Sequence, residues 1–231
     1  MRASLLALLL LATAPAAASA ASVVNPGFET PVVGAGAYTI FNAGDNIGGW
    51  AVTGPASNAV LLLDTNYAEP EVNFPAHSGN QALDLTGAGN TGNGGVNQDI
   101  ATVAGQQYSL DFWLGNANGI DGSQNPNSIY YTSPSSLELF VDGVSQGVFT
   151  NGNVTQGSVN WALETFRFTA TGALTNISFV NATVFSDNYA GLDDVSLTAV
   201  PEPATWAMML LGLGGLGAVM RRRRTALALS V

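Results

Sequence analysis

The chain has 231 residues, of which 16 are acidic and six basic, and it contains no cysteine. This length accommodates one sizeable domain between terminal signals, and the lack of cysteine excludes disulfide cross-links. Residues 22–200 contain 15 acidic side chains and one basic side chain, Arg167, so their net charge is about −14. A surface this negative argues against nucleic acid and anionic membranes as partners, and it is compatible with bound cations.

The first 20 residues have the pattern of a secretory signal peptide. Arg2 supplies the positive end, Leu5 to Leu11 form the apolar stretch, and small residues up to Ala20 form the cleavage region. We therefore expect an N-terminal signal helix at residues 1–20 that signal peptidase removes, and an exported domain at residues 22–199.

The exported segment alternates apolar and polar residues with a period of two, which is typical of half-buried strands. In the clearest example, Tyr108, Leu110 and Phe112 share one face, whereas Asp111 and Trp113 share the other. The same alternation recurs in six further segments: 81–87, 96–103, 135–149, 164–172, 174–180 and 192–200.

Turn residues separate these segments. Asp142-Gly143 is a strong hairpin signal, and the Gly/Asn-rich stretches 87–95 and 116–127 are expected to be long loops. No part of the exported segment has the pattern of a long amphipathic helix. These observations predict an all-β fold, an antiparallel β-sandwich of jelly-roll type with about eight short strands.

Several short motifs, taken together and in order, resemble the galactose-binding-like sandwich of bacterial carbohydrate-binding modules. They are VVNPGFETP at 23–31, GGW at 48–50, HSGNQALDLTG at 77–87, NQDIATVAGQQYSLDFWLGN at 97–116 and LDDVSL at 192–197. The resemblance covers most of residues 22–200, and it implies both a sandwich fold and a role in binding glycans.

The resemblance also implies a structural Ca²⁺ held by Glu29 and by an aspartate of the last strand, Asp193 or Asp194. The two ends of a domain often lie close together, so carbonyl groups of residues 77–80 could complete an oxygen shell at about 2.3–2.6 Å. Strict alternation puts Asp193 and Asp194 on opposite faces, so at most one of them should serve easily. The alternative is that Glu29 caps a turn and the aspartates are solvated edge residues.

A sugar site needs an aromatic plane with polar groups beside it. The candidate set is Trp113 with Asp111, on the same face of the strand, and Asp84. Three further residues would join this set if their strands are neighbours: Asn97, Asp99 and Arg167. The alternative is that a loop covers Trp113. Trp50 and Trp161 are expected to be core residues or loop anchors.

The C-terminal end combines three features in order: Pro201, Glu202 and Pro203, then an uncharged stretch at 204–220, then Arg221, Arg222, Arg223 and Arg224. As a transmembrane helix, the 17 uncharged residues would span about 26 Å, close to the thickness of a membrane core. The positive-inside rule then predicts that the arginines and a tail at 225–231 are cytoplasmic.

Residues 200–224 resemble the PEP-CTERM sorting signal of exported proteins from Gram-negative bacteria. The resemblance implies recognition by an exosortase and a transient anchor in the inner membrane. It also implies removal of the anchor near Pro-Glu-Pro and a final location at the cell surface or in the exopolysaccharide matrix.

Signals for catalysis are sparse. A hydrolase using the single histidine, His77, with a serine and an aspartate has no nucleophile-elbow sequence to support it. The acidic residues single out no glycosidase pair, and no phosphate-binding or zinc-binding motif is present. We therefore expect a non-catalytic module that binds extracellular polysaccharide. The alternative is a structural biofilm-matrix protein, stabilised by calcium and without a sugar pocket.

Overall fold

The computed structural model describes residues 21–69, 72–88, 93–119, 131, 134–183, 189–201 and 209–215. Contacts divide the chain into two compact units, residues 19–200 and the remaining residues at the two ends. The predicted signal peptide, most of the predicted membrane span, Glu202, Pro203 and the four clustered arginines lie outside the described residues.

The described part of the larger unit contains fourteen β-strands. In chain order they are β1 Tyr38–Phe41, β2 Asn46–Ile47, β3 Trp50–Thr53, β4 Val60–Asp64, β5 Ala68–Glu69, β6 Val72–Asn73, β7 Gln81–Asp84, β8 Gly95–Ala101, β9 Gln107–Asn118, β10 Ser135–Val141, β11 Val144–Asn151, β12 Ser158–Thr169, β13 Leu174–Asn181 and β14 Gly191–Ala199.

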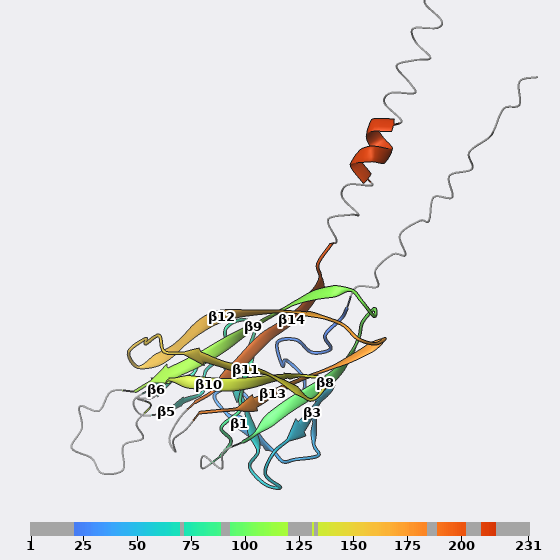
Figure 1. The fold of residues 1–231 in the computed structure, drawn as a ribbon. Helices are drawn as coiled ribbons and strands as arrows, with labels where there is room; N and C mark the ends of the chain where they lie inside the picture. The colour runs from blue at the N-terminus through green and yellow to red at the C-terminus, as the bar shows by residue number, and fades with distance from the viewer. Residues whose placement is uncertain are drawn as a thin grey trace, which may run out of the picture. The chain divides into compact units, whose positions relative to one another are not determined.

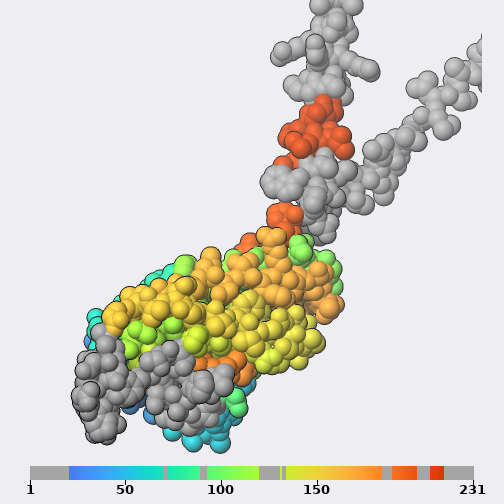
Figure 2. All heavy atoms as spheres, turned by 60° about the vertical axis from the view of Figure 1, so that its left-hand side comes forward, coloured from blue at the N-terminus to red at the C-terminus, as the bar shows by residue number. Residues whose placement is uncertain are grey.

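Two six-stranded antiparallel sheets pack face to face (Figure 1). The first, sheet A, has the order β1-β4-β7-β14-β9-β12, and the second, sheet B, has the order β11-β10-β13-β8-β3-β2. Strands β5 and β6 form a separate small sheet. Edge strands β11 and β12 lie next to each other (Figure 2), where the rings of Phe149 and Phe166 meet edge to face at 6.4 Å. The predicted antiparallel sandwich is therefore confirmed.

The main core lies between the sheets and follows the predicted alternation. Tyr108, Leu110 and Phe112 of β9 are fully buried, and each of the seven alternating segments forms strand. The Asp142-Gly143 turn joins β10 to β11 with both residues at positive φ, 50° and 74°, as a type I′ hairpin requires. Trp50, expected as a core residue, is also fully buried.

The six strands before residue 74 were not apparent from alternation. Strand β4 shows the reason, because the first four residues of its sequence VLLLD are all apolar. Val60 and Leu62 belong to the main core between the sheets, whereas Leu63 belongs to a second cluster. Successive side chains of a strand point to opposite faces, so a strand covered on both faces loses its polar positions.

The second cluster, which we call the outer aromatic cluster, covers part of the outer face of sheet A. Its buried members are Leu63, Val72, Phe74, Ala117, Tyr131, Val159 and Tyr189, with Leu61, Tyr67 and Trp161 packed against them. Phe74 is central, because its ring lies within 5.3–5.6 Å of the rings of Tyr67, Tyr131 and Tyr189. The segment after β6 is thus anchored on the outer face of sheet A.

The C-terminal unit is described only at Pro201 and in a short helix at residues 209–215. Among the residues with a described structure, no helix is long and apolar enough to cross a membrane.

Two facing glycines make room for the outer aromatic cluster. Gly191 of β14 pairs with Gly115 of β9, and a β-carbon on Gly191 would lie 2.7 Å from the Tyr189 hydroxyl and 2.8 Å from the Trp161 ring. We expect Gly191→Ala to destabilise the domain by about 1–3 kcal/mol through overpacking, measured by urea denaturation. Gly152→Ala, with no atom within 4 Å of the added carbon, is the control. Equal stability of the two variants would contradict this packing.

Candidate functional site

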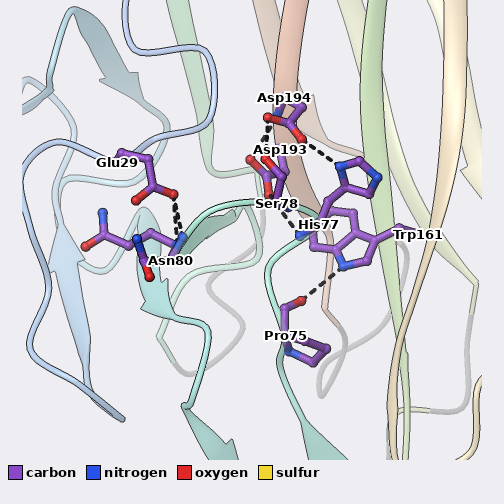
Figure 3. Close-up of polar contacts among 9 residues, drawn as sticks. Glu29, Pro75, His77, Ser78, Asn80, Trp161, Asp193 and Asp194 are labelled. Carbon is purple, nitrogen blue, oxygen red and sulfur yellow. Dashed lines mark hydrogen bonds and ion pairs between the residues drawn. The ribbon is translucent and has the colours of Figure 1, made fainter.

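The turn at residues 75–81 connects the opening motif to the last strand. Val195 of β14 donates its backbone N–H to the Pro26 carbonyl at 2.9 Å. A β-carbon on Gly27 would lie 3.2 Å from an oxygen of Asp194 and 3.5 Å from an oxygen of Asp193. The two ends of the domain therefore meet at this turn (Figure 3), as the sequence predicted.

A bulge in β14 determines where its two aspartates point. The register with β9 shifts between Asp193 and Ser196, and Asp194 adopts a φ of 46°, in the left-handed region that asparagine and aspartate tolerate. Strict alternation would separate the two carboxylates, but both contact residues 77 and 78. The expectation that they lie on opposite faces is wrong, because a bulge inserts an extra residue and reorients side chains.

The Asp193 carboxylate is fully buried and accepts three backbone N–H groups. One oxygen accepts from His77 at 2.9 Å and from Ser78 at 3.2 Å, and the other accepts from Asp194 at 2.8 Å. Burial and the neighbouring Asp194 charge nevertheless raise the pKa of Asp193 to about 7. This carboxylate holds the turn in place.

Asp194 contacts the side chains of the same turn. It accepts a hydrogen bond from the Ser78 hydroxyl at 2.9 Å, and its other oxygen lies 2.6 Å from His77 Nδ1. A protonated His77 therefore forms an ion pair with Asp194. Within the described ranges this is the one ion pair, as expected where acidic side chains greatly outnumber basic ones.

The ring of His77 stacks on Trp113. The ring centroids are 3.7 Å apart and the planes differ by 17°. Trp161 meets the same histidine edge-on at 6.1 Å and donates its indole N–H to the Pro75 carbonyl at 3.0 Å. Trp161 is thus the loop anchor expected from the sequence. Trp113 is half-buried, with one face of its ring against the turn.

Polar side chains continue from Trp113 along the uncovered part of sheet A. Cross-strand pairing places Leu163 beside Trp113, Thr165 and Ser196 beside Asp111, and Arg167 and Thr198 beside Ser109. Cross-strand partners share a face of a sheet. We call this set the Trp113 patch: Trp113, Asp111, Ser109, Leu163, Thr165, Arg167, Ser196 and Thr198. An oxygen of Asp111 accepts the Thr165 hydroxyl at 2.7 Å.

The remaining residues of the predicted sugar site lie elsewhere. Asn97 and Asp99 are on β8, in sheet B. Asp84 is on β7 and is buried, and its Oδ1 accepts the backbone N–H groups of Thr86 at 2.9 Å and Ala190 at 3.2 Å. Of the candidate partners, Asp111 and Arg167 therefore share a surface with Trp113, and Asp84 is inside the protein.

Glu29, the third predicted calcium ligand, caps the same turn from the opposite side. Its Oε1 accepts the backbone N–H groups of Asn80 at 2.8 Å and Gln81 at 3.1 Å. Gly79 lies against this carboxylate at a φ of 63°, where a β-carbon would collide with Glu29. In the described part of the chain, no three acidic, histidine or cysteine side chains converge to hold a metal ion. Calcium binding therefore stays a prediction.

Several residues of the site were not apparent from the sequence. Alternation put Thr165 and Arg167 on one face of their strand, but it did not show that this strand pairs with that of Trp113. The stacking of His77 on Trp113 had no sequence signal, because it depends on a turn about 35 residues earlier in the chain. Pairing between distant strands decides both features.

The geometry defines a β-sandwich with an exposed polar face beside Trp113 and a turn held by carboxylates. A family model described as a protein of unknown function (DUF642) matches residues 21–197, and the chain belongs to this family. The PEP-CTERM protein-sorting motif matches residues 199–224. The resemblance to that signal is thereby confirmed, and the chain is an exported protein with a C-terminal sorting signal.

Comparison with curated proteins found no match. Among solved structures, TmCBM61 in complex with β-1,4-galactotriose is similar, with 18% identity, a TM-score of 0.45, and coverage of 79% of this chain and 100% of the other. A family 35 carbohydrate-binding module from Clostridium thermocellum has 12% identity, a TM-score of 0.40 and coverage of 71% and 99%. The CBM22-1 xylan-binding domain of Paenibacillus barcinonensis Xyn10C has 14% identity, a TM-score of 0.40 and coverage of 74% and 99%. At TM-scores this low, the ligands of these modules have no bearing on this chain.

The burial of Asp84 predicts a pH dependence of stability. Burial raises its pKa to about 6, from 3.8, so the folded state binds this proton more tightly than the unfolded chain does. The stabilisation is fully present below about pH 4 and is lost as the pH rises through 6. Its size is on the order of 2–3 kcal/mol.

We expect Asp84→Asn to make the decrease in stability between pH 4 and 7 shallower, because an amide does not ionise, whereas the contribution of Asp193, with its pKa of about 7, remains. Urea unfolding across this range measures the effect. Asp99→Asn removes the same charge from an exposed position of sheet B and serves as the control for net charge. An unchanged slope in Asp84→Asn would show that Asp84 does not titrate in this range.

Proposed function

We propose that this protein is a non-catalytic glycan-binding module and that the Trp113 patch is its binding surface. The observation that carries the proposal is the placement of the half-buried Trp113 ring beside hydroxyl groups, a carboxylate and a guanidinium on the part of sheet A that the turn leaves exposed. Sugars are bound by such combinations, because a pyranose has an apolar face and a polar rim.

The surroundings of Trp113 suit it to this role. Its ring is held in one orientation by His77, 3.7 Å away, so little conformational entropy is lost when a ligand packs against its free surfaces. The side chains of Thr165, Arg167 and Ser196 are exposed. From Trp113 to Ser109 the patch extends for about 13 Å along the strand, which accommodates more than one sugar ring.

The sorting signal supports a role for the domain after export. In our proposal, signal peptidase and an exosortase process the protein in a Gram-negative bacterium. Before this processing, residues 204–220 anchor the protein transiently in the inner membrane. The mature domain then binds polysaccharide at the cell surface or in the exopolysaccharide matrix. One extended binding face suits a long polymer, because several modules, tethered or released, can each bind a different segment of it.

Affinity electrophoresis tests the proposal. Residues 21–200, which form one compact unit within residues 19–200, are run through gels that contain different polysaccharides, including that of the producing bacterium. We expect retardation by at least one polymer and a loss of affinity of about tenfold or more in Trp113→Ala, equivalent to about 1.4 kcal/mol. Tyr38→Ala, which removes an exposed aromatic ring from β1, is the matched control.

Two further variants separate binding from folding. Trp113→Phe keeps an aromatic plane against His77 and should retain part of the affinity, and Asp111→Asn keeps an acceptor for Thr165. Circular dichroism confirms that each variant is folded. Retardation that survives in Trp113→Ala would move the binding surface elsewhere, and no retardation by any polymer would reject glycan binding.

A second candidate function is a structural matrix protein stabilised by calcium. It is favoured by the bulge of β14, which brings the carboxylates of Asp193 and Asp194 to the same turn in a strongly acidic domain. A divalent cation there would relieve the repulsion between two adjacent negative charges. In this proposal Glu29 and loop carbonyl groups would supply further oxygen ligands after a small rearrangement of the turn.

Thermal unfolding with and without calcium tests this second candidate. Saturation to about 100 times the dissociation constant stabilises by about 2.7 kcal/mol, a rise on the order of 5–10 °C for a domain of this size. We expect EGTA to reverse the rise and Asp194→Asn to abolish it, whereas Asp99→Asn retains it. A melting temperature indifferent to calcium and EGTA would remove the calcium site.

A further inference from the structure

The folded domain continues up to the sorting motif without a spacer. Strand β14 ends at Ala199, and the sorting motif is matched from residue 199. Strand β14 is an inner strand of sheet A: its first two residues, Gly191 and Leu192, pair with β7, and its C-terminal half, up to Ala199, pairs with β9. Leu197, only four residues before Pro201, is 5% exposed and belongs to the main core.

Two hydrogen bonds hold the last residue before the motif. Val200 donates its backbone N–H to the Gln107 carbonyl at 2.8 Å, and the Gln106 side-chain amide donates to the Val200 carbonyl at 2.7 Å. The same amide also donates to the Gln107 carbonyl at 3.0 Å. We call this arrangement the Val200 clasp. Both backbone polar groups of Val200 are therefore occupied within the folded domain.

This arrangement conflicts with the needs of a processing enzyme. Such an enzyme binds several residues on each side of the bond it breaks, in an extended form that is free of other partners. The residues directly before the motif are all held in the fold, because Val200 is clasped and Ala199 is paired with Tyr108. Access to the motif improves when the clasp opens, which is a local fraying at the end of a strand.

We propose that the Val200 clasp limits the access of the sorting enzyme to the Pro-Glu-Pro motif and sets the N-terminal boundary of processing. Processing breaks one peptide bond. The acyl group of the mature domain is transferred to water or to an amine. The C-terminal segment leaves with a protonated new amino terminus. That bond lies on the C-terminal side of Val200, so the mature domain retains β14 and its clasp intact. This inference is independent of glycan binding.

The test is the rate of processing of the full chain in a bacterium that has the sorting enzyme, followed by pulse-chase labelling. Gln106→Ala removes the side-chain half of the clasp and should accelerate processing by roughly twofold to tenfold. Gln107→Ala is the matched control, since its contribution to the clasp is a backbone carbonyl that the substitution retains. Equal half-times for Gln106→Ala and the unaltered chain would overturn the proposal.

A second variant distinguishes access from a general loss of stability. Insertion of Gly-Ser-Gly-Ser between Val200 and Pro201 leaves the clasp unaltered but supplies free chain to the enzyme, and it should accelerate processing at least as much. Slower or unchanged processing of this variant would overturn the proposal. The intact mass of the mature protein checks the boundary, and a C-terminus before Val200 would also contradict it.

Discussion

The candidate site depends on one interaction, the acceptance of three backbone N–H groups by the buried carboxylate of Asp193. A buried N–H without an acceptor costs about 1–3 kcal/mol, and two of these three groups, those of His77 and Ser78, belong to the turn, so this carboxylate holds the 75–81 turn against β14. The turn then holds His77 over Trp113 and offers the Pro75 carbonyl to Trp161. The turn and the outer aromatic cluster therefore cover one part of the outer face of sheet A, and Trp113 lies at the border with the exposed polar part.

The same interaction concentrates negative charge where the domain is already acidic. Burial and the adjacent Asp194 raise the pKa of Asp193, and the bulge that brings them together holds Asp194 at positive φ. The N–H donors and the His77 ring, when protonated, offset part of the unfavourable burial of the Asp193 charge and of its repulsion by Asp194. Glu29 repeats the device on the other side of the turn with two more N–H groups. Carboxylates thus support this segment together with the hydrogen bonds that Thr65 makes to Ala76 and Asn80.

The folded domain fills the interval between the predicted signal peptide and the sorting motif almost completely. Ala21, directly after the predicted cleavage point, already packs against the main core, and the Val200 clasp ends one residue before the Pro-Glu-Pro motif. The family match ends at residue 197 and the sorting motif begins at 199. Strand β14, which carries the two aspartates that contact the turn, therefore also leads directly into the sorting motif.

Local patterns in the sequence were sufficient for the antiparallel sandwich, the β10–β11 hairpin, the buried face of β9 and the C-terminal sorting signal, because each depends on neighbouring residues. Alternation also placed Trp113 and Asp111 on one face, and it failed at β4, where both faces are buried. Only the tertiary structure decided which strands lie beside Trp113 and that Asp84 is internal. It also decided that a bulge directs the carboxylates of both Asp193 and Asp194 to residues 77 and 78. These features depend on pairing between segments far apart in the chain, and strand alternation carries no information about the identity of the partner.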